Sequence, residues 1–263
     1  ISGSLAGGGP VVKASFVDDY TNISTNKNGM SKIGYSFTIG LIAVFLSYLI
    51  GVPVGIIMAL RKDKLLDHIG TFYIVFITAV PSLAYIFLFK SLGGRFGLPT
   101  TFDMENPTWL MYVLPIISLS LPSIANLMKW LRRYMIDQMN SDYVKFARSG
   151  GLSEGEIFRK HILKNAIIPT ITVIGMQLSL VVGGSVVVET IFNINGLGLL
   201  MMNSINNRDY PTIQGIVLLL AVTVCVINLL VDLAYAAVDP RIKAQYVGSV
   251  GKKSRAKKKE AAA

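Results

Sequence analysis

The chain contains, at residues 36–60, the uncharged run SFTIGLIAVFLSYLIGVPVGIIMAL. A helix needs about 20 mostly apolar residues to cross roughly 30 Å of hydrocarbon. Four further uncharged runs of this kind cover Ile69–Phe89, Thr108–Met128, Ala166–Val188 and Thr212–Val231. In lipid, a segment with open ends can satisfy its backbone polar groups only as a helix. The sequence therefore predicts an all-α, polytopic membrane protein whose five spans form a helical bundle.

Composition indicates a membrane protein, and the sequence contains few residues or motifs that could bind a cofactor or metal. Hydrophobic residues make up 52% of the chain and charged residues 15%, with a mean hydropathy of +0.55, which is outside the usual range of soluble domains. The lone Cys225 cannot form a disulfide within the chain, and His68 and His161 are too few for a zinc ligand set. Residues 251–254 lack the spacing of a phosphate-binding loop. We expect no cofactor and no metal in this chain.

Prolines lie inside the predicted spans, where each removes a backbone donor and favours a kink. They are Pro53, Pro81, Pro115, Pro122 and Pro169.

Basic residues indicate which ends of the spans face the cytoplasm, where Lys and Arg are retained. Three of them follow the first span, and eight lie between the third and fourth spans; these are Arg61, Lys62, Lys64, Lys129, Arg132, Arg133, Lys145, Arg148, Arg159, Lys160 and Lys164. The opposite connections carry only Lys90, Arg95 and Arg208. The basic tail then places the C-terminus in the cytoplasm, and the bilayer is an obligatory partner.

The predicted organisation has three parts. Residues 1–35 read as an extracytoplasmic loop or linker, residues 36–238 as the transmembrane domain, and residues 239–263 as a basic cytoplasmic tail. A sixth span before Ile1 is expected, because five spans that end inside place the first residues outside. The net charge of +10 is accounted for by cytoplasmic basic regions beside anionic lipid, so nucleic acid is not expected as a partner.

The cytoplasmic connection, residues 129–165, is too long for a simple turn. Within it, Ser153-Glu154-Gly155-Glu156 matches a capping box, in which the Ser153 hydroxyl accepts from the Glu156 amide and the Glu156 side chain reaches back. A short helix is expected from Ser153 to Lys164, with Ile157, Phe158 and Ile162 on one apolar face. Two uses of that face stay open: it lies in the lipid interface, or it inserts into a groove on a soluble partner.

Another short helix is expected before it, at Tyr143–Ser149. Gly150 and Gly151 follow and allow the positive φ that a sharp turn requires.

Several stretches carry a family resemblance. Residues 142–153, DYVKFARSGGLS, and 159–169, RKHILKNAIIP, resemble the cytoplasmic EAA loop of binding-protein-dependent ABC importers, in its dipeptide/oligopeptide version. Val188–Phe192, Gly196–Gly198 and residues 208–211 are similar to the segment between the last two spans of such permeases, and 228–241 to their C-terminal signature. The chain differs in having Lys145-Phe146-Ala147 for Glu-Ala-Ala and Ile194-Asn195 where the family often has Trp-Pro.

The resemblance implies a non-catalytic permease subunit for oligopeptides or dipeptides in the bacterial cytoplasmic membrane. Its partners would be a homologous permease, two cytoplasmic ATPases that bind ATP and Mg, and an extracytoplasmic peptide-binding protein. The loop would hold the coupling helix that sits in a cleft of the ATPase. The residues assigned to coupling are Ala147, Gly151, Leu152, Ser153, Glu156, Ile157, Phe158, His161 and Ile162.

Polar residues within spans are candidates for the translocation pathway, because they should face protein or water rather than lipid. They are Gln177, Ser179 and Asn228. Hydrogen bonding between helices is the alternative role for each. Asp232 and Glu189 lie near span ends, where an ionisable group can reach the interface.

Other functions also fit the spans. A secondary transporter or channel would need no ATPases, but a carrier of that kind should show a buried carboxylate or broken helices in paired positions. Permeases of the same group for nickel or another small solute are a second alternative. A membrane scaffold whose basic loop docks a cytoplasmic protein is a third.

Overall fold

The computed structural model describes residues 32–103, 107–182 and 185–238, except for the side chains of residues 171, 172, 174, 179–182, 235 and 238. In this part of the chain all regular structure is helical. The elements are α2 (Lys32–Leu60), α3 (Leu65–Ala79), α4 (Ser82–Arg95), α5 (Trp109–Met139), α6 (Asp142–Ser149), α7 (Glu154–Ile157), the π-helix η1 (Phe158–Leu163), α8 (Lys164–Val182), α9 (Val186–Phe192), α10 (Leu197–Asn206) and α11 (Tyr210–Val238). The predictions for 1–31 and for the tail lie outside the described residues.

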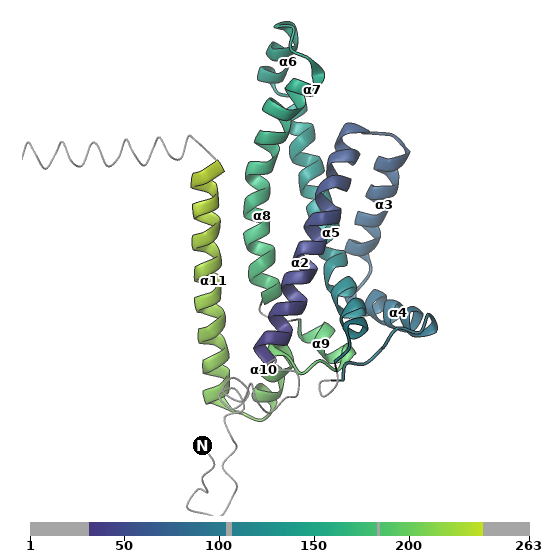
Figure 1. Ribbon diagram of the computed structural model, residues 1–263, viewed down its shortest axis with the longest axis vertical. Helices are drawn as coiled ribbons and strands as arrows, with labels where there is room; N and C mark the ends of the chain where they lie inside the picture. Colours follow the sequence, from purple (N-terminus) through teal and green to yellow (C-terminus); the bar gives the residue numbers. More distant parts are fainter. Residues whose placement is uncertain (1–31, 104–106, 183–184, 239–263) are drawn as a thin grey trace, which may run out of the picture.

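The long helices form one elongated bundle, which confirms the all-α class. Helices α2, α5 and α11 are each long and apolar enough to cross a membrane, and two bent pairs, α3 with α4 and α9 with α10, pass the same criterion together. Helix α8 runs alongside α2 and α5 (Figure 1). Helices α6 and α7 lie at one end of the bundle, here called the inner end, and α9 and α10 at the other, the outer end.

The predicted span Ile69–Phe89 is wrong as a single helix. It is broken between α3 and α4, whose axes differ by 110°. Pro81 has no N–H, and the residue before a proline is driven out of the helical region. Val80 accordingly has φ −83° and ψ 130°, so this proline turns the chain instead of kinking a helix.

The first and last spans extend past their predicted ends, to Lys32 and to Val238, and two other spans differ more. Helix α5 continues to Met139 rather than ending near Met128, because charged residues do not stop a helix once it has left the apolar layer. The predicted span Ala166–Val188 is not one helix: α8 ends at Val182, and the Ser185 hydroxyl starts α9 by accepting from the Val188 amide at 3.3 Å. Hydropathy averages over a run of residues, so it does not reveal a helix cap inside an apolar run.

The tightest helix contact is between α2 and α5. Small residues recur every fourth position along α2, and the Ser47 hydroxyl lies 3.3 Å from the Ser120 carbonyl oxygen of α5. A Cβ placed on Gly51 would lie 3.0 Å from the Leu127 side chain, and one on Gly55 would lie 3.3 Å from Leu131. Small residues let helix backbones approach closely, which is how helices associate in lipid.

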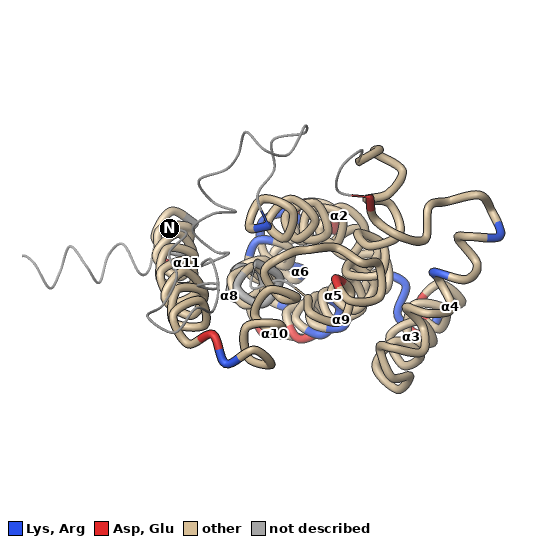
Figure 2. The backbone as a smooth tube through the Cα atoms, turned by 90° about the horizontal axis from the view of Figure 1, so that it is seen from below, with Lys and Arg blue, Asp and Glu red and all other residues tan. Residues whose placement is uncertain are grey.

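The remaining helices are arranged on either side of this pair. Viewed along the bundle, α11 lies beyond α8 on one side, and α3 and α4 lie on the other (Figure 2). Helix α11 contacts α8 and α10, and only 11% of its most apolar window is buried. The exposed face of α11 is therefore available to lipid or to a second membrane protein.

The outer end is held by a buried carboxylate. Glu189, which is 4% exposed, accepts a hydrogen bond from the Ser36 hydroxyl at 2.8 Å and another from the Leu199 amide at 2.8 Å. The Ser36 oxygen also accepts from the Leu197 amide at 2.8 Å. A Cβ on Gly196 would lie 2.4 Å from that oxygen, so the chain needs glycine here. Through these contacts α9 and the start of α10 are fixed to the first turns of α2.

Replacement of Gly51 tests the α2–α5 contact. Gly51→Val places methyl groups against Leu127, and overpacking of this kind costs about 1–3 kcal/mol. We expect a fall of several degrees in the melting temperature in detergent, followed by size-exclusion chromatography of heated samples.

The control is Leu49→Val, which introduces the same β-branched side chain at a nearby exposed position. An equal effect of both substitutions would show that the valine backbone preference, and not packing, controls stability.

Candidate coupling site

The inner end of the bundle has its own hydrophobic core. It joins the last turns of α2 and α5 to α6, α7, η1 and the first turn of α8. Its buried members, here called the inner core, are Ala59, Leu131, Met135, Val144, Ala147, Ile157, Ile162 and Ala166. The predicted loop is therefore a packed extension of the bundle rather than a free hairpin.

The predicted cap at Ser153 is confirmed in its main contact. The Ser153 hydroxyl accepts from the Glu156 amide at 3.3 Å, and α7 begins at the next residue. The second half of the capping box is wrong, because the Glu156 carboxylate instead accepts from the Lys160 ammonium at 2.6 Å. That contact lowers the pKa of Glu156. A cation one turn further along the helix competes for the carboxylate with the backbone amide.

The turn between α6 and α7 is closed by an ion pair. Gly151 has φ +80°, as the sequence predicts, whereas Gly150 does not adopt positive φ. Across the turn, the Arg148 guanidinium donates to both Glu154 oxygens, at 2.6 and 3.1 Å. The guanidinium holds the pKa of the Glu154 carboxyl below its usual range. Because both side chains are in water, this pair fixes the geometry of the turn more than it adds stability.

Neither proposed use of the apolar face of 153–164 fits the structure. Ile157 is 0% exposed and Ile162 is 3% exposed, since both side chains belong to the inner core. Phe158 is half-buried against the same core. The helix is also not separate, because α7 continues through η1 directly into α8. The prediction left this face for lipid or a partner because it ended the span near Met128, whereas the last turns of α5 cover the face.

The nine predicted coupling residues lie together but do not share one surface. Gly151, Leu152 and Ser153 are exposed in the turn, while Glu156, Phe158 and His161 are half-buried. Ala147, Ile157 and Ile162 are inside. Of these nine residues, only the three in the turn are exposed.

Phe146 is the exposed residue that sequence reasoning missed. Its side chain is 79% exposed, next to the 38% exposed Leu152. The helical spacing of the sequence does indicate this exposure. Val144 and Ala147 form the inward face of an eight-residue helix, and Phe146 lies outside that face. We call Phe146, Arg148, Gly151, Leu152, Ser153 and Glu154 the docking surface.

The predicted pathway residues are not brought together. Gln177 is 5% exposed, and its amide donates to the Ser123 carbonyl of α5 at 3.1 Å, a contact between helices. Asn228 is exposed on α11. Ser179 lies in α8, but its side chain is outside the described residues. A pathway role stays a prediction for all three.

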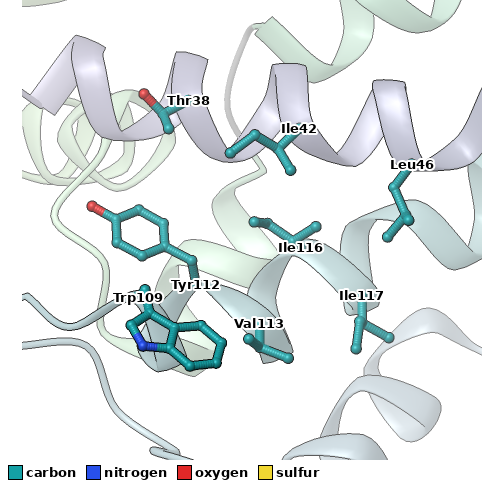
Figure 3. A pocket seen from close by; sticks show the side chains of 8 residues that line it. All are labelled: Thr38, Ile42, Leu46, Trp109, Tyr112, Val113, Ile116 and Ile117. Carbon is teal, nitrogen blue, oxygen red and sulfur yellow. The ribbon is translucent and has the colours of Figure 1, made fainter.

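A largely open apolar cavity of about 630 Å³ lies between α2 and α5. Its lining runs from Trp109 and Tyr112 near the start of α5 to Leu46 and Ile117 deeper along the two helices (Figure 3). None of the lining residues is charged, so this cavity has no group to bind an ionic ligand. In the part of the chain that the structure describes, no three His, Cys, Asp or Glu residues are placed to hold a metal.

The sequence of the whole bundle assigns a family. Residues 51–244 match the model of the binding-protein-dependent transport system inner membrane component. This range includes most of the spans and all of the inner end, and the chain belongs to this family of ABC importer permeases.

Its relatives include permeases with peptide names. The chain is 37% identical to a candidate peptide permease of Brucella suis biovar 1, covering 81% of this chain and 70% of that protein. It is 35% identical to the oligopeptide transport system permease protein AmiC of Streptococcus pneumoniae, covering 86% of this chain and 46% of AmiC. It is 38% identical to the glutathione transport system permease protein GsiC of Pectobacterium atrosepticum, covering 73% and 63% of the two chains.

Solved structures confirm the fold. A chain of an amino acid ABC transporter with histidines has a TM-score of 0.64 at 19% identity, covering 86% of this chain and 99% of that one. A chain of the inward-facing MetNI methionine ABC transporter has a TM-score of 0.61 at 14% identity, covering 79% and 94%. These likenesses show the permease fold alone.

Two aspartate substitutions separate folding from docking. Ile157→Asp removes a buried side chain, whose truncation alone costs about 2–5 kcal/mol, and it also buries a carboxylate. We expect little folded protein in detergent extracts, measured by size-exclusion chromatography.

The exposed Phe146→Asp should change stability by no more than about 0.5 kcal/mol, as is usual at the surface. If Ile157→Asp were as stable as the wild-type chain, the inner core would not hold the docking surface in place.

Proposed function

We propose that this chain is the permease subunit of an ATP-driven importer of peptides and that its docking surface binds a cytoplasmic ATPase. The family match over residues 51–244, with peptide permeases among the relatives, carries the proposal. The relatives' names support peptides as the substrate class.

The proposed complex has several other members. A homologous permease would complete the translocation pathway, and the largely exposed face of α11 is suited to a membrane partner. Two ATPase subunits would bind and hydrolyse ATP with Mg, and an extracytoplasmic protein would deliver peptide. The permease itself would then be non-catalytic.

The proposed location is the cytoplasmic membrane, with the inner end and the C-terminus in the cytoplasm. Most basic residues of the connections lie at the inner end, which is the retained side under the positive-inside rule. Helix α11 ends toward that same end of the bundle (Figure 1).

The inner core suggests how motion would reach the pathway. Closure of the ATPases on ATP would displace the docking surface, which is attached to α2, α5 and α8 through one set of buried side chains. Interiors this densely packed move as units rather than deform. The span ends would therefore shift together, and the state favoured by ATP would be the one with better docking contacts.

A secondary transporter is the second candidate function, and two features of the structure are relevant to it. The structure has two bent helix pairs and a buried carboxylate, Glu189. However, Glu189 has hydrogen-bond donors on both oxygens, from Ser36 and from a backbone amide. That arrangement suits a structural carboxylate better than a proton or ion site.

The docking surface can be tested with two exposed phenylalanines. Phe146→Ala should weaken co-purification of the ATPases at least tenfold and abolish ATP-dependent peptide uptake in proteoliposomes, because a large exposed aromatic is a typical binding hot spot.

The matched control is Phe96→Ala, with a side chain that is 84% exposed at the end of α4, and it should leave ATPase co-purification unchanged. Peptide uptake by this chain without any ATPase would refute the ATP-driven importer and support the secondary transporter.

A further inference from the structure

One hydroxyl group lies where four helical elements meet. Tyr143, in the first turn of α6, donates its phenolic proton to the Gln138 side-chain oxygen at the end of α5. Its oxygen accepts from the Asn165 amide of α8 at 3.0 Å and lies 3.3 Å from the His161 carbonyl oxygen of η1. The Tyr143 and His161 rings also lie near each other, with centroids 6.3 Å apart.

The Tyr143 hydroxyl can donate only one hydrogen bond at a time. The hydroxyl has a single proton, which goes to Gln138 or to the His161 carbonyl, and its lone pairs receive the Asn165 amide. A phenylalanine at this position keeps the ring and its packing but loses all three contacts. The hydroxyl thus has a role that can be removed without disturbing the inner core.

The contacts fall on the least regular part of a long helix. From Glu154 to Val182 the chain is continuously helical, but Phe158–Leu163 forms a π-helix. Such turns are rare, lie often at functional sites, and are places where a helix can change its twist. The π-turn lies between the docking surface and α8, so a twist there would take up part of the motion that the inner core would otherwise pass to α8.

We propose that Tyr143 is a positioning residue for coupling, whose hydroxyl fixes the π-turn so that displacement of the docking surface reaches α5 and α8. The hydroxyl contacts His161 inside the π-turn and Asn165 just after it, and it ties both to Gln138 of α5. This inference rests on the proposed importer function.

The test compares Tyr143→Phe with wild type in proteoliposomes that contain the complete importer. Peptide taken up per ATP hydrolysed should fall about two- to tenfold, the factor expected from losing one net hydrogen bond, while ATPase co-purification stays unchanged. Hydrogen exchange of the amides at 158–165 should accelerate by a similar factor. A purely structural tyrosine would lower protein yield without changing the transport ratio.

Two further variants complete the experiment. Tyr134→Phe removes a hydroxyl from the same end of α5, where the ring stacks on Trp130 at 5.8 Å, and it should behave as wild type. Asn165→Leu keeps the branched shape of the side chain but removes the donor to Tyr143, and it should reproduce part of the Tyr143→Phe effect.

The outcomes separate the two claims. If wild type imports peptide with ATP and Tyr143→Phe keeps the wild-type ratio, or fails to assemble, the positioning role is wrong. If wild type shows no ATP-dependent uptake, the importer function fails. The hydrogen-exchange comparison then still decides whether the hydroxyl fixes the π-turn: unchanged exchange overturns that claim, and faster exchange supports it.

Discussion

The close approach of α2 and α5 is the contact around which the other helices are arranged. Gly51 and Gly55 leave space for Leu127 and Leu131, so the two backbones come nearer than larger side chains would allow. In lipid, burial of apolar surface gives no drive for helices to associate, and shape complementarity of this kind replaces it. Helix α8 packs against both members of the pair, and α3 packs along α5. The pair also extends into the inner core through Ala59 and Leu131.

The two ends of the bundle are fixed by different chemistry. At the outer end, the carboxylate of Glu189 gathers the Ser36 hydroxyl and the first amides of α10. At the inner end, apolar burial of residues such as Val144 and Ile157 dominates. Polar contacts there shape the turn and join neighbouring helices through the Tyr143 hydroxyl. A bidentate pair between Asp67 and Arg132, with both distances at 2.6 Å, joins the first turn of α3 to α5 beside the inner core. Directional bonds thus set positions, while packing makes the bundle rigid.

Hydropathy alone predicts the all-α class and the first and last spans, because these depend on composition along the chain. The cap at Ser153 and the positive φ of Gly151 were also predictable, since each depends on neighbours within a few residues. The break at Pro81 was underestimated, because a proline kinks or ends a helix according to its tertiary surroundings. The burial of Ile157 was missed, because an apolar face looks the same whether its own chain or a partner covers it.

Helix α6 has buried residues on one face and exposed residues on the other, which affects how its sequence can vary. Val144 and Ala147 point into the protein, and Phe146 and Arg148 point away from it, within a helix of eight residues. Residues that hold the fold and residues that are free for another protein are therefore interleaved in one short helix. If the docking surface binds an ATPase as proposed, substitutions in the outward set would change that contact while the inner core, and with it the folded membrane domain, is kept.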